Sequence, residues 1–253
     1  IPIDNPKMWA GSLLLIRSIT YPSGSIFAFT VRNRNIEKTE NDLNELLNPL
    51  SNENILVNSA IIEDSDFLHG AKLVMQTLKS GTFRPNTLFL TLGSNTNNDE
   101  MINELVSYTV KYKLGVMILY QYKRVAFGLQ KDLNLWLRDE SPNWHLAMLI
   151  ALQLQLNWRG KLNVITVASE QKNVRRLSTF LEHLGDQVRL PSMTEFHVLV
   201  GNFQDILGTA PRADLNIFGL AEDLSFGFMR NAPKKTKSSC IYIGDSGQES
   251  ALI

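Results

Sequence analysis

The sequence has almost no cysteine, since Cys240 is the only one. A single thiol cannot form a disulfide within the chain, so the fold is expected not to depend on oxidation, and a reducing, cytosolic compartment is indicated. Long apolar runs are also missing, because no window approaches the ~18 to 20 consecutive apolar residues that a spanning helix needs. These absences argue against secretion and predict a piece that is soluble by itself.

Excess charge of one sign is absent as well. The chain has 25 Lys and Arg residues and 25 Asp and Glu residues, which gives no formal net charge. Bulk electrostatics therefore attract neither nucleic acid nor an anionic membrane surface. We expect no nucleic-acid partner.

The chain begins Ile1-Pro2-Ile3-Asp4, without an initiator Met and without the basic and apolar segments of a signal peptide. We interpret it as a fragment of a longer protein. Its 253 residues, 44% of them hydrophobic, suffice for one large domain or two small ones.

Strand and helix patterns alternate along the chain. Residues 11–19 and 26–31 are apolar runs separated by a short Pro/Gly turn, which is too short for a parallel crossover and predicts an antiparallel pair. Further strands are predicted over residues 55–62, 87–92, 115–121, 133–137, 162–168, 187–190, 213–220 and 239–244. Helices are predicted over residues 40–50, 66–81, 99–111, 142–158, 171–184, 195–207 and 223–231. This alternation predicts an α/β fold, a three-layer sandwich around a mostly parallel or mixed sheet.

Two segments resemble each other. Residues 69–92 and 196–220 both read as a helix, Gly-Thr, a Pro-containing turn and an apolar strand, which suggests a weak internal duplication. A boundary near residues 123–131 would then separate two α/β subdomains, residues 1–125 and 126–253. The alternative is that any αβ unit resembles any other.

Two glycine motifs invite a chemical interpretation. Residues 244–247, Gly-Asp-Ser-Gly, copy the nucleophile motif of trypsin-like proteases, but those are all-β proteins rich in disulfides, so a turn between two short terminal strands is predicted instead. Glycines at strand ends, Gly93 and Gly244, could begin phosphate loops, yet the chain ends too soon after Gly244 for the later Gly and Ser/Thr positions and the helix start that such loops need, and Gly93 has no second glycine at useful spacing.

Metal ligands are not predicted. His69, His145, His183 and His197 are far apart in sequence, and none has a His or Cys partner at helical spacing. The acidic pairs Asp64/Asp66, Asp99/Glu100 and Asp139/Glu140 fit helix starts, with Asp64 or Ser65 as candidate N-cap before the second helix. Lys234, Lys235 and Lys237 read as a solvated loop. We predict no catalytic, cofactor-binding or metal-binding residue, no cofactor and no enzymatic activity.

The predicted helix at residues 142–158 is apolar on nearly all sides, so it needs cover all round. A purely internal core and a partial contribution from a second subunit both remain open. Trp144 and Met148 are the first residues to test at a subunit interface.

Several strings match a known family. Residues 81–92 (GTFRPNTLFLTL) resemble a Gly-x-x-(Lys/Arg)-Pro-Asn-Thr motif followed by a strand, and residues 133–167 resemble an Asp-x-Trp-Trp strand, a Leu-rich helix and a further strand. Lys7-x-Trp9 and residues 247–251 (GQESA) agree more weakly. In their order and spacing these segments resemble the carboxy-terminal cytosolic domain of cation-chloride cotransporters.

The resemblance implies two tandem halves similar to universal stress proteins, a homodimer, and a transmembrane transport domain upstream that moves chloride with Na+ or K+. The chain would be the regulatory and dimerisation domain on the cytoplasmic side of the membrane. It departs from the family in lacking room for a helix between its first two predicted strands and in lacking long phosphorylatable insertions, as a compact prokaryotic-type member would. Two alternatives stay open: a nucleotide-binding protein like the universal stress proteins, and an α/β enzyme with an unrecognised site.

Overall fold

The structure is a computed structural model that describes residues 1–6, 9–53, 55–81, 84–138 and 144–252. The chain folds as two compact units. Unit 1 comprises Ile1–Leu90 and Asn95–Val116, and unit 2 comprises Thr91–Ser94 and Met117–Ile253. No helix in the described ranges is long and apolar enough to cross a bilayer.

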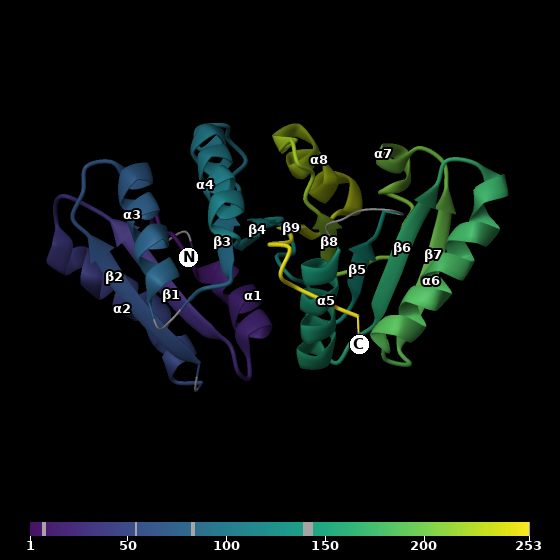
Figure 1. The fold of residues 1–253 in the computed structure, drawn as a ribbon, viewed down its shortest axis with the longest axis horizontal. Helices are drawn as coiled ribbons and strands as arrows, with labels where there is room; N and C mark the ends of the chain where they lie inside the picture. The colour runs from purple at the N-terminus through teal and green to yellow at the C-terminus, as the bar shows by residue number, and fades with distance from the viewer. Residues whose placement is uncertain (7–8, 54, 82–83, 139–143, 253) are drawn as a thin grey trace. The chain divides into compact units, whose positions relative to one another are not determined.

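Unit 1 alternates helices and strands. Its elements are α1 (Ala10–Thr20), β1 (Ser25–Val31), α2 (Ile36–Ser51), β2 (Leu56–Ile62), α3 (Phe67–Ser80), β3 (Thr87–Thr91), α4 (Asp99–Tyr112) and the start of β4 (Gly115–Tyr120). Strands β1 and β2 pair in parallel, with Ser25 opposite Leu56 and Val31 opposite Ile62. Helix α2 makes the crossover between them (Figure 1).

The predicted antiparallel pair at the start of the chain is wrong. Residues 11–19 belong to helix α1, and the first extended segment lies earlier, where Pro2 bridges Phe29 in parallel. Ile3 N–H donates to the Phe29 carbonyl and Phe29 N–H to the Ile1 carbonyl. A helix therefore does connect the first two extended segments, so this supposed departure from the family disappears.

The apolar run of α1 misled the prediction because the helix buries one broad face and also carries an apolar residue on its exposed side. Leu13, Leu15 and Ile16 are all buried, while Leu14 lies outward. A run of three leucines favours a helix over a strand, since Leu is a better helix former than the β-branched residues.

Unit 2 contains the larger sheet. Its elements are β5 (Leu133–Trp136), α5 (His145–Trp158), β6 (Leu162–Ala168), the 3-10 turn η2 (Gln171–Asn173), α6 (Val174–Val188), β7 (Thr194–Val200), α7 (Phe203–Ile206), β8 (Leu215–Gly219), α8 (Phe226–Thr236) and β9 (Ser239–Gly244). The strand order is β4-β9-β8-β5-β6-β7, with β3 next to β4.

Most neighbouring strands of this sheet run in parallel, and the register is level. Leu133 lies opposite both Leu162 and Leu215, and Leu215 lies opposite Ser239. The exception is β4, which runs antiparallel to its neighbour β9. Tyr122, just beyond the last residue of β4, donates its N–H to the hydroxyl of Ser239, so the end of β4 lies beside the start of β9. The sheet is therefore mixed, as the sequence predicted.

Helices cover both faces of this sheet. In unit 2, α5 and α6 follow β5 and β6 on one face, and α7 and α8 lie on the other (Figure 1). Right-handed crossovers require this arrangement, since the chain moves from β5 towards β7 and later from β8 towards β9. The predicted three-layer α/β architecture is correct for this unit.

Two predicted elements of unit 2 are wrong. Residues 195–207, predicted as one helix, form the edge strand β7 and the single-turn helix α7. Residues 187–190, predicted as a strand, begin in the last turn of α6, whose C-cap Arg189 has φ 53°. The segments chosen as a duplication, residues 69–92 and 196–220, therefore do not correspond, because one begins with a helix and the other with a strand. Lys234 and Lys235 lie in α8 rather than in a loop.

Candidate functional site

The carboxyl ends of β5 and β8 are the first place to look for a ligand. These neighbouring strands are followed by helices on opposite faces of the sheet, which makes a topological switch point. In open α/β sheets, ligands bind in the crevice outside the strand ends at such a point.

Aromatic side chains occupy the face of the sheet beside this point. The rings of Trp136, Phe218 and Tyr242 stack across β5, β8 and β9, with centroids 5.5 Å apart and planes 16° apart at each step. All three are buried, and the rings of Phe203 and Phe228 pack against the stack from α7 and α8. This part of the sheet is a packed core.

The Tyr242 hydroxyl lies inside the same core. It donates a hydrogen bond of 2.9 Å to the carbonyl of Met229 on α8, and burial raises the pKa of Tyr242 well above its ordinary value. Burial also raises the pKa of the nearby Cys240 thiol to about 12. Neither group is suited to act as a nucleophile or base at neutral pH.

Asp245 caps helix α5. Its carboxylate accepts hydrogen bonds from the N–H groups of His145 (2.9 Å) and Leu146 (3.0 Å), the first two residues of the helix. Free N–H groups at a helix N-terminus are the usual site for a phosphate. Here the chain's own carboxylate uses two of them.

A charged Asp245 should make stability depend on pH. Burial is the largest influence and raises the pKa of Asp245 above 3.8, so the folded state favours the protonated form. This carboxyl therefore disfavours folding at neutral pH, and that effect disappears as pH falls through the raised pKa. The free energy of unfolding of Asp245→Asn, relative to that of the parent, should therefore be higher at about pH 7 than at about pH 4. Urea unfolding of both proteins at each pH checks this; a difference in free energy that is independent of pH would contradict it.

The Gly-Asp-Ser-Gly motif has no protease geometry. The hydroxyl of Ser246 accepts from the Gln248 N–H at 3.2 Å, and Nδ1 of His145 accepts from the Ala251 N–H at 3.2 Å. The predicted turn between two terminal strands is wrong too, because within residues 245–252 no strand follows β9. The motif ends a strand and caps a helix.

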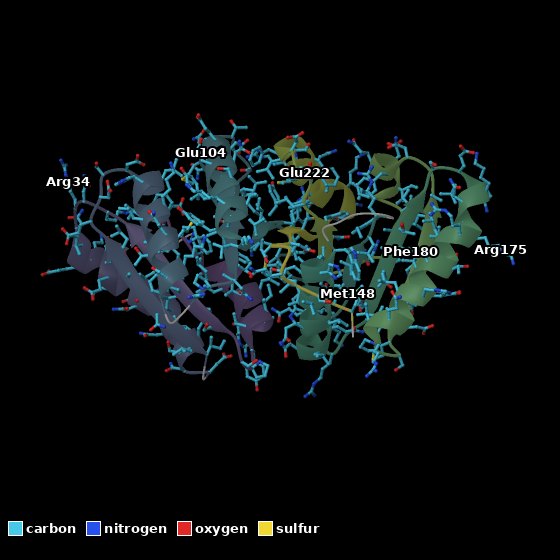
Figure 2. The ribbon with its side chains drawn as sticks, in the orientation of Figure 1. Arg34, Glu104, Met148, Arg175, Phe180 and Glu222 are labelled. Carbon is cyan, nitrogen blue, oxygen red and sulfur yellow. The ribbon has the colours of Figure 1, made fainter. Side chains whose placement is uncertain are left out.

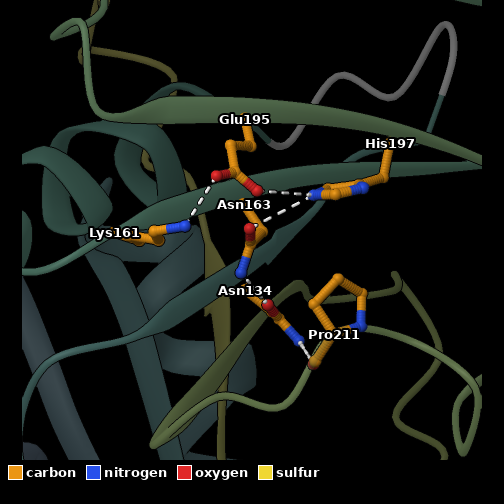
Figure 3. A network of polar contacts seen from close by, with 6 residues as sticks. All are labelled: Asn134, Lys161, Asn163, Glu195, His197 and Pro211. Atoms are coloured by element: carbon orange, nitrogen blue, oxygen red, sulfur yellow. Dashed lines mark hydrogen bonds and ion pairs between the residues drawn. The ribbon is translucent and has the colours of Figure 1, made fainter.

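A ladder of buried amides crosses the other end of the same sheet (Figure 3). Asn163 Nδ2 donates to Asn134 Oδ1 at 2.9 Å, and Asn134 Nδ2 donates to Asn216 Oδ1 at 3.2 Å and to the Pro211 carbonyl at 2.7 Å. At one end, Asn216 Nδ2 donates to the Ser238 hydroxyl at 2.6 Å. We call Asn134, Asn163 and Asn216 the asparagine ladder.

Beyond Asn163 the ladder reaches the surface. His197 Nε2 lies 3.2 Å from Asn163 Oδ1, and Glu195 forms an ion pair of 2.7 Å with Lys161 (Figure 3). That pairing lowers the pKa of Glu195 and raises that of Lys161. The bonds of the ladder run within the sheet rather than towards an opening, so its role is to hold the strands in register.

Sequence reasoning missed the ladder, although a signal was present. Each of the three strands begins with the same pair, Leu133-Asn134, Leu162-Asn163 and Leu215-Asn216. The register places these asparagines side by side.

His69, His145 and His197 make ordinary polar contacts, and His183 is exposed on α6. His69 Nδ1 lies 2.6 Å from Asp64 Oδ2; the Asp66 N–H and this histidine lower the pKa of Asp64. The N-cap of α3 is Asp66, which accepts from the N–H groups of Leu68 and His69, rather than Asp64 or Ser65. Asp139 and Glu140 lie outside the described residues. Among those that are described, no group of three or more His, Cys, Asp or Glu residues could hold a metal ion.

Helix α5 keeps one apolar face open. Leu149, Leu152 and Leu156 follow one another at three- and four-residue spacing, so they share a face. Leu149 is 37% exposed and Leu156 is 65% exposed. Met148, labelled in Figure 2, is fully buried and therefore cannot lie at an interface, whereas Trp144 is half-buried.

Comparison with known proteins shows what this chain is similar to. The profile of the first C-terminal domain of prokaryotic cation-chloride cotransporters matches residues 1–127, and that of the second matches residues 128–252. The crystal structure of the cytoplasmic domain of a prokaryotic cation chloride cotransporter is 30% identical, with a TM-score of 0.88 over 99% of this chain and 96% of that one.

Universal stress proteins share the fold. One from Archaeoglobus fulgidus DSM 4304 is 15% identical, with a TM-score of 0.60 over 95% of this chain and 96% of that one. A putative one from Pseudomonas aeruginosa UCBPP-PA14 is 12% identical, with a TM-score of 0.58 over 96% and 90%. No curated protein sequence matches the chain. The predicted α/β fold of two tandem halves similar to universal stress proteins is confirmed.

Proposed function

The chain belongs to the family of C-terminal domains of prokaryotic cation-chloride cotransporters, and we propose that it is the cytosolic regulatory and dimerisation domain of such a transporter. The resemblance inferred from residues 81–92 and 133–167 is thereby confirmed. In this proposal chloride crosses with Na+ or K+ in a transmembrane domain of the same protein, and no residue of this chain touches the ions. The chain has two subdomains, residues 1–125 and 126–253, and no enzymatic activity.

The observation that carries the dimerisation proposal is the open apolar face of α5. Leucines at Leu149, Leu152 and Leu156 form a stripe along a helix whose other sides are buried in unit 2. Covering such a stripe with the same stripe of a second copy removes apolar surface from water on both. A dimer interface can then bias the transporter as far as its contacts differ between transport states.

Charge on the leucine stripe should separate the subunits. Leu149→Glu combined with Leu156→Glu is expected to raise the dimer dissociation constant at least about 100-fold, because two unpaired carboxylates per subunit would have to be buried. Sedimentation equilibrium over a wide concentration range measures this. Leu73→Glu, at an exposed leucine of α3, is the matched control and should leave association unchanged.

A parent protein that stays monomeric at high concentration would contradict the dimerisation proposal.

Sedimentation equilibrium with ATP added tests the nucleotide-binding alternative. We expect ATP to change neither association nor thermal stability, because Asp245 already uses the α5 amides and the helix after Gly93 begins with Asp99 and Glu100. Saturable ATP binding that is lost in Gly93→Val or Gly244→Val would favour the alternative.

A further inference from the structure

The loop between β4 and β5 combines exposed cations with exposed apolar side chains. Lys123, Arg124 and Lys131 are exposed, and between them Val125 is 46% and Leu129 is 81% exposed. Among the large apolar side chains of the described residues Leu129 is the most exposed, ahead of Val110 at 77%. Cations around a protruding leucine are typical of surfaces that meet lipid headgroups.

Hydrogen bonds to the backbone of the loop fix Leu129 in an outward position. The Asp214 carboxylate accepts from the N–H groups of Leu129 (3.2 Å), Lys131 (2.8 Å) and Asp132 (3.2 Å). Gly128, with φ +51°, lies so close that a Cβ there would be 1.9 Å from Asp214 Oδ1. Only glycine fits that position, so the bend that turns Leu129 to solvent is built into the sequence.

The other side of the loop is anchored in the core. Phe127 is buried, and the Ser239 hydroxyl both accepts from the Tyr122 N–H and donates to the Ala126 carbonyl. The exposure of Leu129 therefore comes from a fixed loop conformation.

More cations lie at the same edge of the sheet. The starts of β5, β6, β8 and β9 are level, and the residues just before the last three include exposed Arg159, Lys161, Arg212 and Lys237. Glu195 pairs with Lys161 and neutralises it, Asp214 binds three N–H groups, and Asp132 is half-buried. Asp186, in the last turn of α6, is exposed and is offset by exposed Arg189. We call this surface, with the 123–131 loop, the basic edge.

The opposite edge of unit 2 carries both signs of charge. Glu222 and Asp223 follow β8, and Asp245 and Glu249 follow β9, but exposed Arg138 follows β5, and exposed Lys172, Arg175 and Arg176 follow β6. An excess of cations therefore belongs to the basic edge. The expectation that electrostatics cannot attract an anionic membrane holds for the total charge of the chain but not for the basic edge.

We propose that the basic edge lies against the anionic lipid headgroups of the bilayer, with Leu129 entering the interface between headgroups and acyl chains. The proposal rests on the proposed function, because a transporter domain has that bilayer within reach. A single-stranded nucleic acid would call for exposed aromatic rings to stack on its bases, and the aromatic residue of the loop, Phe127, is buried. Leucine between cations suits lipid instead.

Vesicle co-sedimentation of the full chain tests the proposal. We expect binding to phosphatidylcholine vesicles containing about a third phosphatidylglycerol, little binding to phosphatidylcholine alone, and loss of binding in about 0.5 M salt. Lys123→Gln with Arg124→Gln should weaken binding about 25-fold, since each cation near an anionic surface contributes about fivefold. Leu129→Ser should weaken it about tenfold.

The matched control removes two cations from η2 and the first turn of α6. Lys172→Gln with Arg175→Gln should bind vesicles like the parent; Arg175 lies at the rim of unit 2 (Figure 2). Thermal unfolding of every variant confirms that it is folded. Equal binding by the parent and the Lys123/Arg124 variant, or equal binding to both kinds of vesicle, would overturn the proposal.

A label at position 129 separates lipid contact from contact with protein. In Leu129→Cys a polarity-sensitive fluorophore should shift to the blue on adding anionic vesicles, and Cys240 would not react because it is buried with a raised pKa. If the shift occurs only in the intact transporter and not with vesicles, the edge docks on the transmembrane domain and the lipid proposal is wrong. If the chain forms a dimer but does not bind anionic vesicles, the lipid proposal is wrong and the proposed function is unaffected.

Discussion

Phe218→Ala is expected to lower the free energy of unfolding by about 3–5 kcal/mol, the range for truncating a fully packed aromatic core residue. Phe218 is the middle ring of the stack, between Trp136 and Tyr242, and rings of Phe203 and Phe228 meet it edge-on. Its removal leaves a cavity that the neighbouring rings cannot all close, because they belong to four different elements. Urea or guanidinium unfolding measures the loss.

The control for this prediction is Phe203→Ala. Phe203 touches the same cluster but is partly exposed, so the loss should be about 1 kcal/mol. Equal losses in the two variants would show that the stack is not the central part of the core. If the switch point between β5 and β8 instead held an open ligand cavity, Phe218 would be loosely packed and its truncation would change the free energy of unfolding much less. Phe218→Ala is therefore also a test of the packed-core interpretation.

Asn134→Leu should destabilise the protein by about 2–4 kcal/mol, because a buried amide N–H of Asn163 and the Pro211 carbonyl lose their side-chain partner. Asn134 is at the centre of the asparagine ladder: Asn163 Nδ2 loses its acceptor and the Pro211 carbonyl loses a donor, while Asn216 Oδ1 keeps the hydrogen bond from Trp136 Nε1. Asn231→Leu, on the exposed side of α8, is the control and should change the free energy of unfolding by less than about 0.5 kcal/mol.

A double variant distinguishes a network from independent contacts. Removing both members of a hydrogen-bonded pair leaves fewer unsatisfied groups than removing one, so Asn134→Leu with Asn163→Leu should cost clearly less than the sum of the single variants. Additive losses would contradict the ladder as a coupled network. Chemical unfolding of the parent, both singles and the double completes this cycle.

Apolar patterns within short windows predicted secondary structure correctly for segments that are buried on nearly all sides. Strands β6, β8 and β9 are nearly continuous apolar runs because helices cover both faces of the sheet, and the sequence predicts each of them. Helix α5 was predicted for the same reason, since its apolar residues lie on nearly all sides. The family also followed from the order of short segments such as residues 81–92.

Local patterns failed where partners far away in the sequence decide the structure. Residues 11–19 were interpreted as a strand because only a short turn separates them from the apolar run of β1, which suggested an antiparallel pair. In the structure β1 pairs with Pro2 and with β2 instead. Residues 195–207 read as a helix, although pairing with β6 makes the first half an edge strand.

The amino-acid sequence by itself determined the α/β class, the family and most of the core strands, because these depend on apolar patterns and motif order within short windows. Tertiary structure decided the mixed sheet order, the asparagine ladder, the Asp245 cap and the exposure of Leu129. Each of these depends on which residues from distant segments become neighbours. Leu133-Asn134 and Leu215-Asn216 are 82 residues apart along the chain, and only the register of parallel strands brings their amides within 3.2 Å.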